Sequence, residues 1–339
     1  MLGAIPPKRS VMAENDSTVE EIIKVRKKRK TKSKTKKIIL IIAIVILGIL
    51  AATGIAIALY VNSLSEAIKI DDPEVSDNLK QVLTPVEADS DAYYTLILGS
   101  DAREGDVTSR SDVIILMRVD PENAQLTMVS IPRDTRVEIE GYGMQKINAA
   151  YAIGGASASV DAVSKFANVP ITHYAEIHFE ELKKLVDLLG GVWIDVPVAN
   201  DETGESNTGF EFEPGEQLLD GENALAFARE REGYERGDFQ RSDSQRLLLN
   251  AIMKKVLSAS PIDLPGVVQQ AAQCASSDYT INDLIDLALK FQSSEDITVY
   301  SCMAPSSLAT IDDLVFAISD EPKWKAMMER VDAGKNPIQ

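Results

Sequence analysis

Four arginines stand in short polar segments of a chain that is acidic overall. They are Arg133, Arg229, Arg231 and Arg241. The net charge of the 339 residues is −17, so the chain as a whole repels anions. A guanidinium stays charged and bonds phosphate oxygens bidentately, which makes arginine suited to holding a phosphate in such a protein. The pattern predicts a site for a particular phosphate.

Two aspartates come at the ends of predicted strands. Asp101 follows a short apolar strand that ends at Gly99, and Asp112 comes directly before the next strand. Ligands of open α/β sheets bind beyond the carboxyl ends of strands. If the two strands are neighbours, Asp112 approaches Asp101. Two carboxylates beside a phosphate favour Mg²⁺, or Mn²⁺, as the cofactor.

Arg133 and Asp134 are placed by a strand end. Pro132 precedes them and cannot donate to a strand ladder, so the strand stops there. Both charged residues are then expected on a loop at a sheet edge. The alternative is that they only pair with each other.

Arg229 and Arg231 are two residues apart, so on a regular helix they would point to different faces. Both can meet one ligand only if the predicted helix over residues 220–229 ends near Arg229. Arg241 is expected just before a helix over residues 242–257, whose amino end favours an anion. The alternative for this segment is a solvated charged surface.

Other kinds of site find little support. The sequence has no Gly-rich loop ending in Gly-Lys-Ser/Thr and no Gly-x-Ser-x-Gly elbow. Its two histidines, His173 and His178, are more typical of packing or surface residues than of ligands. With two cysteines, they are too few to favour a zinc site.

Apolar runs and turn residues predict an α/β fold. Strands are expected over residues 94–99, 113–119, 126–131, 171–177, 192–196 and 297–303. Helices are expected over residues 146–153, 157–167, 180–189, 220–229, 242–257 and 281–291. The turn at residues 120–123 joins two of the strands into a hairpin. Strands interleaved with helices, including one hairpin, predict a mixed central sheet with helices on both faces.

An uncharged stretch over residues 38–60 is long enough to cross a bilayer. Residues 24–37 before it carry ten Lys or Arg and no acid, a flank that stays in the cytoplasm by the positive-inside rule. We expect a basic disordered cytoplasmic tail (1–37), one transmembrane helix (38–60), an extracytoplasmic stalk (61–92) and one domain (93–339). The alternative is a cleaved signal peptide, whose apolar core is usually shorter.

The expected extracytoplasmic part carries the acidic excess of the chain, because the tail is basic and the span is uncharged. Such a domain is not expected to bind nucleic acid. Cys274 and Cys302 both fall in it, where disulfides persist. A disulfide and two buried thiols are both open alternatives.

The order of these motifs resembles that of the LytR-CpsA-Psr (LCP) family of cell-wall phosphotransferases. The resemblance covers about residue 93 to at least residue 257. It is carried by LGSDAR (98–103), RSD (110–112), SIPRDT (130–135), KINAA (146–150), GGVWIDVP (190–197), LDG (219–221), ARER (228–231) and GDFQR (237–241) through Gln245. The family often has arginine directly before that glutamine, where this chain has Ser244.

The resemblance implies transfer of a glycopolymer from an undecaprenyl-diphosphate carrier to a sugar hydroxyl of peptidoglycan, which forms a phosphodiester. The implied partners are the lipid-linked glycopolymer, peptidoglycan and the cell membrane, with the catalytic domain outside the cell. The lipid is implied to lie in an apolar channel, for which helix faces within residues 182–189 and 247–256 could supply walls.

The resemblance also implies roles for single residues. The implied metal ligands are Asp101 and Asp112, and the implied substrate-binding residues are Lys146 and Gln245. The implied catalytic residues are Asp101, Arg103, Arg133, Asp134, Arg229, Arg231 and Arg241. The general base is open, with Asp101 and Asp134 as candidates.

Two other functions remain as alternatives. The same site could hydrolyse the polyprenyl diphosphate if water replaced the sugar. The chain could also be a non-catalytic wall-binding or regulatory protein, although the expected cytoplasmic segment has only 37 residues and no DNA-binding motif.

Overall fold

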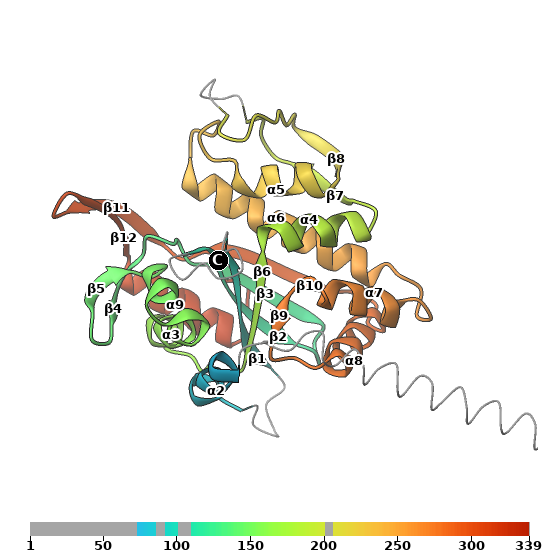
Figure 1. Cartoon of the computed structure of the whole chain (residues 1–339), viewed down its shortest axis with the longest axis horizontal. Coiled ribbons are helices and arrows are strands. Elements are labelled where there is room, and N and C mark those ends of the chain that lie inside the picture. Colours follow the sequence, from blue (N-terminus) through green and yellow to red (C-terminus); the bar gives the residue numbers. More distant parts are fainter. Residues whose placement is uncertain (1–72, 86–91, 101–109, 201–205, 339) are drawn as a thin grey trace, which may run out of the picture. The chain divides into compact units, whose positions relative to one another are not determined.

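A six-stranded mixed sheet forms the centre of the folded domain (Figure 1). The computed structural model describes residues 73–85, 92–100, 110–200 and 206–338. The strand order is β10–β3–β2–β1–β6–β9. The strands are β1 (Tyr93–Ser100), β2 (Ser111–Asp120), β3 (Gln125–Ser130), β6 (His173–His178), β9 (Ser276–Ser277) and β10 (Thr298–Met303). β1 is parallel to β6 and β3 is parallel to β10, whereas β2 is antiparallel to both of its neighbours. The predicted mixed sheet and its β2–β3 hairpin are therefore confirmed.

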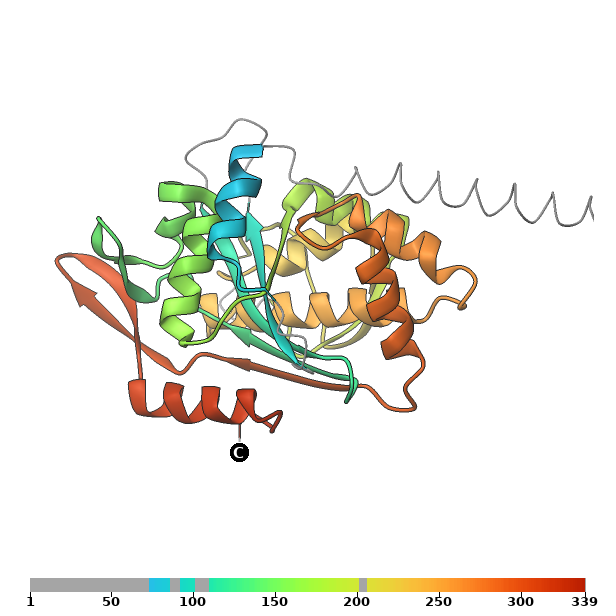
Figure 2. The ribbon, with the colours of Figure 1, turned by 90° about the horizontal axis from the view of Figure 1, so that it is seen from below.

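Three helices cover one face of the sheet (Figure 2). They are α2 (Pro73–Val82), α3 (Ala149–Ala167) and α9 (Glu321–Asp332). Leu98 and Leu116 point to this face and are fully buried. The ring of Trp324 in α9 stacks on Phe166 of α3, with 4.9 Å between the ring centroids.

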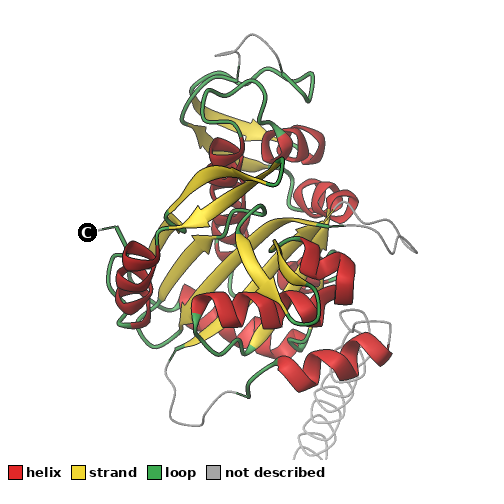
Figure 3. Cartoon of the chain, turned by 90° about the vertical axis from the view of Figure 1, so that its left-hand side faces the viewer, coloured by secondary structure: helices red, strands yellow, loops and turns green. Residues whose placement is uncertain are grey.

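Helices α6 (Asp238–Leu257), α7 (Leu264–Ala272) and α8 (Ile281–Gln292) lie on the other face. Figure 3 shows helices packed around the strands of the domain. Successive residues of a strand point to opposite faces, so Met117 packs here while Leu116 packs on the first face. Met117 and Met128 meet Phe291 of α8 in this second core.

A third core lies among α4 (Phe179–Leu188), α5 (Gly221–Arg229) and the hairpin of β7 (Val192–Val196) and β8 (Gly215–Leu219). Phe212 and Phe227 meet edge to face in it, 5.5 Å apart. Two further hairpins are formed by β4 (Arg136–Ile139) with β5 (Gly143–Lys146), and by β11 (Ser306–Ile311) with β12 (Leu314–Ser319).

Two predicted helix boundaries near the candidate site are wrong. Lys146 ends β5 instead of starting a helix, because residues 143–146 pair with β4 and are held extended. α6 begins at Asp238, four residues before the predicted start, because Gly237 turns the chain there with a φ of 49°. Arg241 consequently lies in the first turn of α6 and not before it.

Part of the expected stalk belongs to the folded domain. α2 falls within residues 61–92, and its Leu79 is 1% exposed in the core beneath α3. The expected tail and span, residues 1–60, lie outside the described residues. Within the described ranges, no helix is long and apolar enough to cross a membrane.

Cys274 and Cys302 are both free and buried. Cys302 lies in the core beneath α3 and α9, and Cys274 lies in the core around α4 and α5. Of the two alternatives for this pair, the structure therefore has the buried thiols and not the disulfide.

Candidate active site

Asp112 and Arg133 meet at the end of the sheet where β1 ends and β2 begins. Ser100 at the end of β1 pairs with Ser111, so Asp112 lies beside the end of β1. Arg133 follows β3, and its Nη1 donates to Oδ1 of Asp112 at 2.5 Å. Burial lowers the pKa of Arg133, but its hydrogen bond with Asp112 and the nearby carboxylates raise it above the ordinary value.

Helix α6 adds a second acid and a second arginine. Oδ1 of Asp238 lies 3.7 Å from Nη2 of Arg133 and 2.5 Å from Nη2 of Arg241. Asp112, Arg133, Asp238 and Arg241 thus alternate in charge, and we call them the charge cluster. Arg241 is 7% exposed. Burial lowers its pKa, Asp238 opposes that change, and the positive charges of Arg133 and Arg231 lower the pKa further.

The charge cluster is incomplete in its hydrogen bonding. The Nε atoms of Arg133 and Arg241 are buried and have no acceptor within the part of the chain that the structure describes. The first turn of α6 lies in the same place, since it carries Asp238 and Arg241. Free backbone N–H groups at a helix start favour an anion. The amino end of α6, which carries a partial positive charge, therefore lies beside the two arginines of the charge cluster.

Helix α5 ends at Arg229, as the two-residue spacing of Arg229 and Arg231 requires if they are to share a ligand. Glu230 between them is extended, with φ −63° and ψ 131°. Its buried carboxylate fixes this break. It accepts hydrogen bonds from the side chains of Ser206, Thr208 and Asn200 and from the backbone N–H groups of Arg231 and Gly233.

Glu230 is a positioning residue that the sequence did not reveal. Burial raises its pKa, but the hydrogen bonds from Ser206, Thr208 and their neighbours outweigh burial and hold the pKa below its ordinary value. The acid therefore stays ionised and ties the arginine segment to Asn200, Ser206 and Thr208. The only sequence signal was its place between two arginines.

The side chains of Arg229 and Arg231 have different described contacts. Arg231 is 42% exposed in its side chain and contacts Glu232, with 3.1 Å between Nη2 and Oε1. The guanidinium of Arg229 lies 5.3 Å from the ring centre of Phe179, at the start of α4. The structure thus brings Arg133, Arg231 and Arg241 together, whereas the described contact of Arg229 is with α4.

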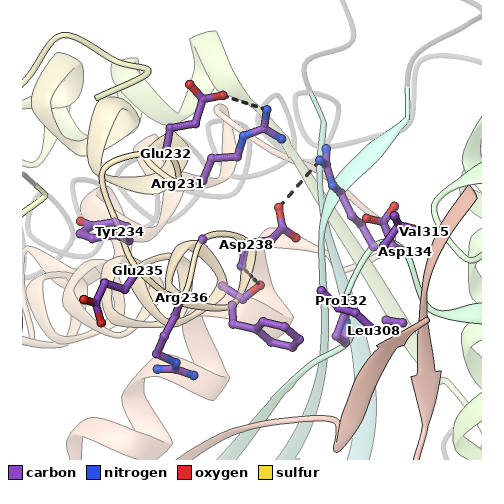
Figure 4. Close-up of a pocket in the computed structure, with 15 residues that line it drawn as sticks. Pro132, Asp134, Arg231, Glu232, Tyr234, Glu235, Arg236, Asp238, Leu308 and Val315 are labelled. Atoms are coloured by element: carbon purple, nitrogen blue, oxygen red, sulfur yellow. Dashed lines mark hydrogen bonds and ion pairs between the residues drawn. The ribbon is translucent and has the colours of Figure 1, made fainter. Parts of the chain in front are cut away.

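A cavity of about 490 Å³ opens beside the charge cluster (Figure 4). Segment 231–239 lines one side of it, and residues 132–134 with the β11–β12 hairpin line the other. Arg133, Asp134, Arg231 and Asp238 all face this volume. Arg133, Asp134 and Arg231, which were expected at one site, therefore line a space large enough for a ligand.

Two of the other predicted residues have structural contacts. Nζ of Lys146 lies 2.8 Å from Oδ1 of Asp134 and so holds that carboxylate at the cavity. Nε2 of the buried Gln245 donates to the backbone oxygen of Ala228, which supports the end of α5. Ser244, at the position where an arginine was expected, is fully buried and has no hydrogen-bond partner among the described residues.

Asp101 and Arg103, two of the predicted site residues, lie outside the described residues. In the described ranges, no group of three or more His, Cys, Asp or Glu converges as a metal site. Asp112 is bound to Arg133 through one oxygen. A carboxylate has lone pairs on both oxygens, so Asp112 fits an ion that shares it with the arginine.

A buried acid network adjoins the same end of the sheet and was not predicted. Oε1 of Glu176 accepts from Ser100 at 3.0 Å and from Tyr151 at 2.5 Å, and Tyr174 donates to Oε2. Burial and the charge of Glu176 raise the pKa values of both tyrosines, so they remain donors. Nδ1 of His178 lies 2.8 Å from Oγ of Ser100. The network fixes the last residue of β1.

A second cavity, of about 310 Å³, is lined almost wholly by apolar side chains. It lies between the sheet and helices α6, α7 and α8, with Ile97 and Met117 on one wall and Ile252 and Met253 on the other. Of the two helix faces proposed as channel walls, 247–256 contributes to it. The other face is not part of it, because Leu182 and Leu185 pack into the core around α5.

The chain matches the model of the LytR_cpsA_psr family over residues 57–332. It is 37% identical to the polyisoprenyl-teichoic acid–peptidoglycan teichoic acid transferase TagU of Halalkalibacterium halodurans, over 73% of this chain and 82% of that protein. The protein of the same name in Bacillus mycoides is 36% identical, over 75% of this chain and 86% of its own length.

Solved structures are similar over the folded domain. The crystal structure of TagV from B. subtilis superposes with a TM-score of 0.62 at 31% identity, over 72% of this chain and 96% of that chain. The structure of TagT bound to LIIa-WTA superposes with a TM-score of 0.61 at 25% identity, over 74% of this chain and 93% of that chain. Both support the mixed α/β fold.

Proposed function

The chain belongs to the LytR-CpsA-Psr family of transferase enzymes, and we propose that it moves a glycopolymer from an undecaprenyl-diphosphate carrier to a sugar hydroxyl of peptidoglycan. The observation that carries this proposal is the charge cluster beside the 490 Å³ cavity. The names of the relatives make a teichoic acid the first polymer class to test.

The diphosphate would bind between Arg133 and Arg231, which both line the cavity. Arg241 adds a third positive charge from the first turn of α6, held by Asp238. Fixed cations of this kind stabilise charge that develops on the leaving phosphate and need no reorganisation during the reaction.

In the proposed reaction, the acceptor hydroxyl oxygen attacks the phosphorus that carries the glycopolymer. The new bond is the phosphodiester P–O bond. The bond from that phosphorus to the bridging oxygen breaks, and polyprenyl phosphate leaves with the electron pair. The hydroxyl proton passes to a carboxylate, for which Asp101 and Asp134 are the candidates. Lys146, 2.8 Å from Asp134, would hold that acid in position.

Mg²⁺, or Mn²⁺, is part of the proposal, with Asp101 and Asp112 as its ligands. A bound divalent ion would neutralise phosphate charge during transfer. We predict that exhaustive chelation abolishes transfer and that Mg²⁺ restores it. Asp112→Asn should raise the Mg²⁺ concentration that half-restores activity, and full activity after chelation would exclude a metal role.

The chain would act at the outer surface of the cell membrane, held by a single span over residues 38–60. This position would bring the domain to a carrier whose lipid tail lies in the bilayer. The tail would enter the apolar cavity beneath α6, which has the chemistry that a hydrocarbon chain needs.

The test is reconstitution of the full chain in membranes with a polyprenyl-diphosphate-linked glycan and with peptidoglycan. Mass spectrometry should find the glycan joined to peptidoglycan through a phosphodiester, together with free polyprenyl phosphate. The same reaction without peptidoglycan shows how much water replaces the sugar. Release that peptidoglycan does not alter, with no joined product, would indicate a hydrolase instead.

A further inference from the structure

We propose that the 490 Å³ cavity holds the acceptor, and that the β11–β12 hairpin is its sugar-binding wall. The inference rests on the proposed function, because it assigns one of the two substrates to this volume. The occupant is a sugar of a peptidoglycan glycan strand, with its reacting hydroxyl toward Arg133 and Asp238.

The hairpin offers apolar side chains that its own fold does not bury. Leu308 is 61% exposed and Val315 is 46% exposed, and both line the cavity. Leu308 pairs with Ala317 and Thr310 pairs with Val315, so Leu308, Val315 and Ala317 share one face of the hairpin. A sugar ring presents C–H groups on its faces and needs apolar contacts of this kind.

The β11–β12 hairpin is hydrogen-bonded to the loop that carries Arg133. The backbone N–H of Ala317 donates to the carbonyl of Asp134 at 2.9 Å, and Thr135 forms a bridge with Ala317. The ring of Phe316 lies 5.8 Å from the guanidinium of Arg136 and 5.9 Å from Nζ of Lys146. The apolar wall is therefore held at a fixed position relative to Arg133.

The arginines of the cavity would hold the diphosphate of the donor, whereas its carboxylates suit the sugar of the acceptor. Glu232, Asp134 and Asp238 line it together with the arginines (Figure 4). Carboxylates accept hydrogen bonds from sugar hydroxyls but repel the phosphates of an anionic polymer. The lipid of the donor has a separate place, because the apolar cavity beneath α6 shares no lining residue with this one.

Two leucines of the same hairpin provide a matched test. Leu308 and Leu314 are similarly exposed, at 61% and 56%. Leu314 pairs with Ile311 and therefore points to the opposite face, and it does not line the cavity. Leu308→Ser and Leu314→Ser remove the same side chain from the two faces. Neither should unfold the domain, which thermal melting checks.

The full chain and both variants are assayed with a short synthetic glycan on a polyprenyl diphosphate. Transfer to soluble peptidoglycan glycan strands is measured beside release of polyprenyl phosphate in their absence. Leu308→Ser should lower the ratio of transfer to release about tenfold and raise KM for the glycan strands, since a lost apolar contact weakens acceptor binding. Leu314→Ser should leave the ratio unchanged.

Two results would overturn this inference and leave the proposed function standing. An equal loss of transfer and release in Leu308→Ser would show that the hairpin wall of the cavity contacts the donor and not the acceptor. An unchanged ratio in Leu308→Ser would show that the hairpin does not contact the acceptor. A full chain that neither transfers nor releases would instead overturn the proposed function, and this inference with it.

Discussion

At the scale of residues, the charge cluster explains how an acidic chain keeps cations close together. Arg133 lies between Asp112 and Asp238, and Asp238 also binds Arg241. Both arginines of the charge cluster have an acid partner, so their mutual repulsion is offset before a phosphate arrives. The side chain of Arg231 is more exposed than those of Arg133 and Arg241, and its described ion pair is with Glu232.

Arg231→Ala should lower the transfer rate about 100-fold or more, the usual cost of removing one donor to a developing oxyanion. Arg231→Lys should also be costly, because a point charge does not replace a planar fork. The melting temperature should stay nearly constant, since the side chain is 42% exposed.

Arg236→Ala is the control for this prediction. Arg236 lies in the same segment, but its Nη1 pairs with Asp243 at 2.7 Å, and Figure 4 shows it pointing away from Arg231. Equal losses in the two variants would mean that the cavity needs only positive charge and not a placed guanidinium.

The cysteines give a second residue-scale prediction. Burial raises the pKa of the Cys302 thiol to about 11 and also raises that of Cys274. Thiols of this kind react slowly, because the thiolate is the reactive form. A thiol reagent should therefore count two thiols in denaturant without a reductant and almost none in the native protein. Zero thiols after denaturation would show a disulfide.

At the scale of elements, the break after α5 depends on one buried acid. Glu230 receives hydrogen bonds from Asn200, Ser206 and Thr208 and from the backbone beyond Arg229. It therefore sets the angle at which Arg231 leaves the helix. Its influence on the site is through position and not through contact with substrate.

Glu230→Gln should lower the free energy of unfolding by about 2 kcal/mol at neutral pH, the size expected for hydrogen bonds to a charged group. The pKa of Glu230 is lowered by folding. Its contribution is therefore present above the ordinary glutamate range and is lost as the pH falls through the lowered pKa.

The measurement is denaturant unfolding of both proteins between neutral pH and about pH 3. The difference in the free energy of unfolding between the wild-type protein and Glu230→Gln should become smaller as the pH falls, since the wild-type carboxylate takes up a proton. A difference in unfolding free energy that stays constant over this range would show that the charge of Glu230 does not stabilise the fold.

Strands with a strong apolar pattern in the central sheet were predicted from the sequence. Strands that form only through pairing within the β4–β5 and β11–β12 hairpins were not. β1, β2 and β3 read as buried runs, and the structure has all three. β11 has only exposed and half-exposed residues in no regular order, so apolar periodicity gives no signal there. β12 is an exception, because residues 314–318 are an apolar run that was not predicted as a strand, and only Phe316 and Ala317 in it are buried. The sequence likewise placed Arg133 on a loop after β3, but its ion pair with Asp112 depends on the pairing of β1 with β2.

Glu176 illustrates the same limit within the site. Its partners Ser100, Tyr151 and Tyr174 come from different strands and a helix, and only the fold brings them together. A single glutamate in a predicted strand has no spacing that marks it as buried and hydrogen-bonded.

At the scale of the whole domain, helix α6 joins the two cavities. Asp238 in its first turn lines the charged cavity, and Leu249, Ile252 and Met253 line the apolar one. These positions are separated by roughly 16 to 22 Å along the helix, at about 1.5 Å per residue. A lipid diphosphate with its headgroup at Arg133 could therefore run its tail along the same helix.

This arrangement predicts that affinity depends on the length of the lipid tail. Soluble polyprenyl diphosphates of increasing length should bind more tightly at first, since each covered CH₂ contributes about 0.8 kcal/mol. The gain should stop once the 310 Å³ cavity is full. Calorimetric titration of the headgroup alone and of a series of tail lengths measures both the rise in affinity and the length at which it stops.

Ala288→Trp tests whether the apolar cavity is the place of the tail. Ala288 lines that cavity on α8, so an indole there should remove most of the gain from longer tails while leaving binding of the headgroup alone unchanged. Ala326→Trp is the matched control, because Ala326 is exposed on α9, which packs on the other face of the sheet. Affinity that does not change with tail length would show that the apolar cavity does not bind the lipid tail. Equal effects of the two tryptophans would show that the tail binds elsewhere, because only one of them occupies the space beneath α6.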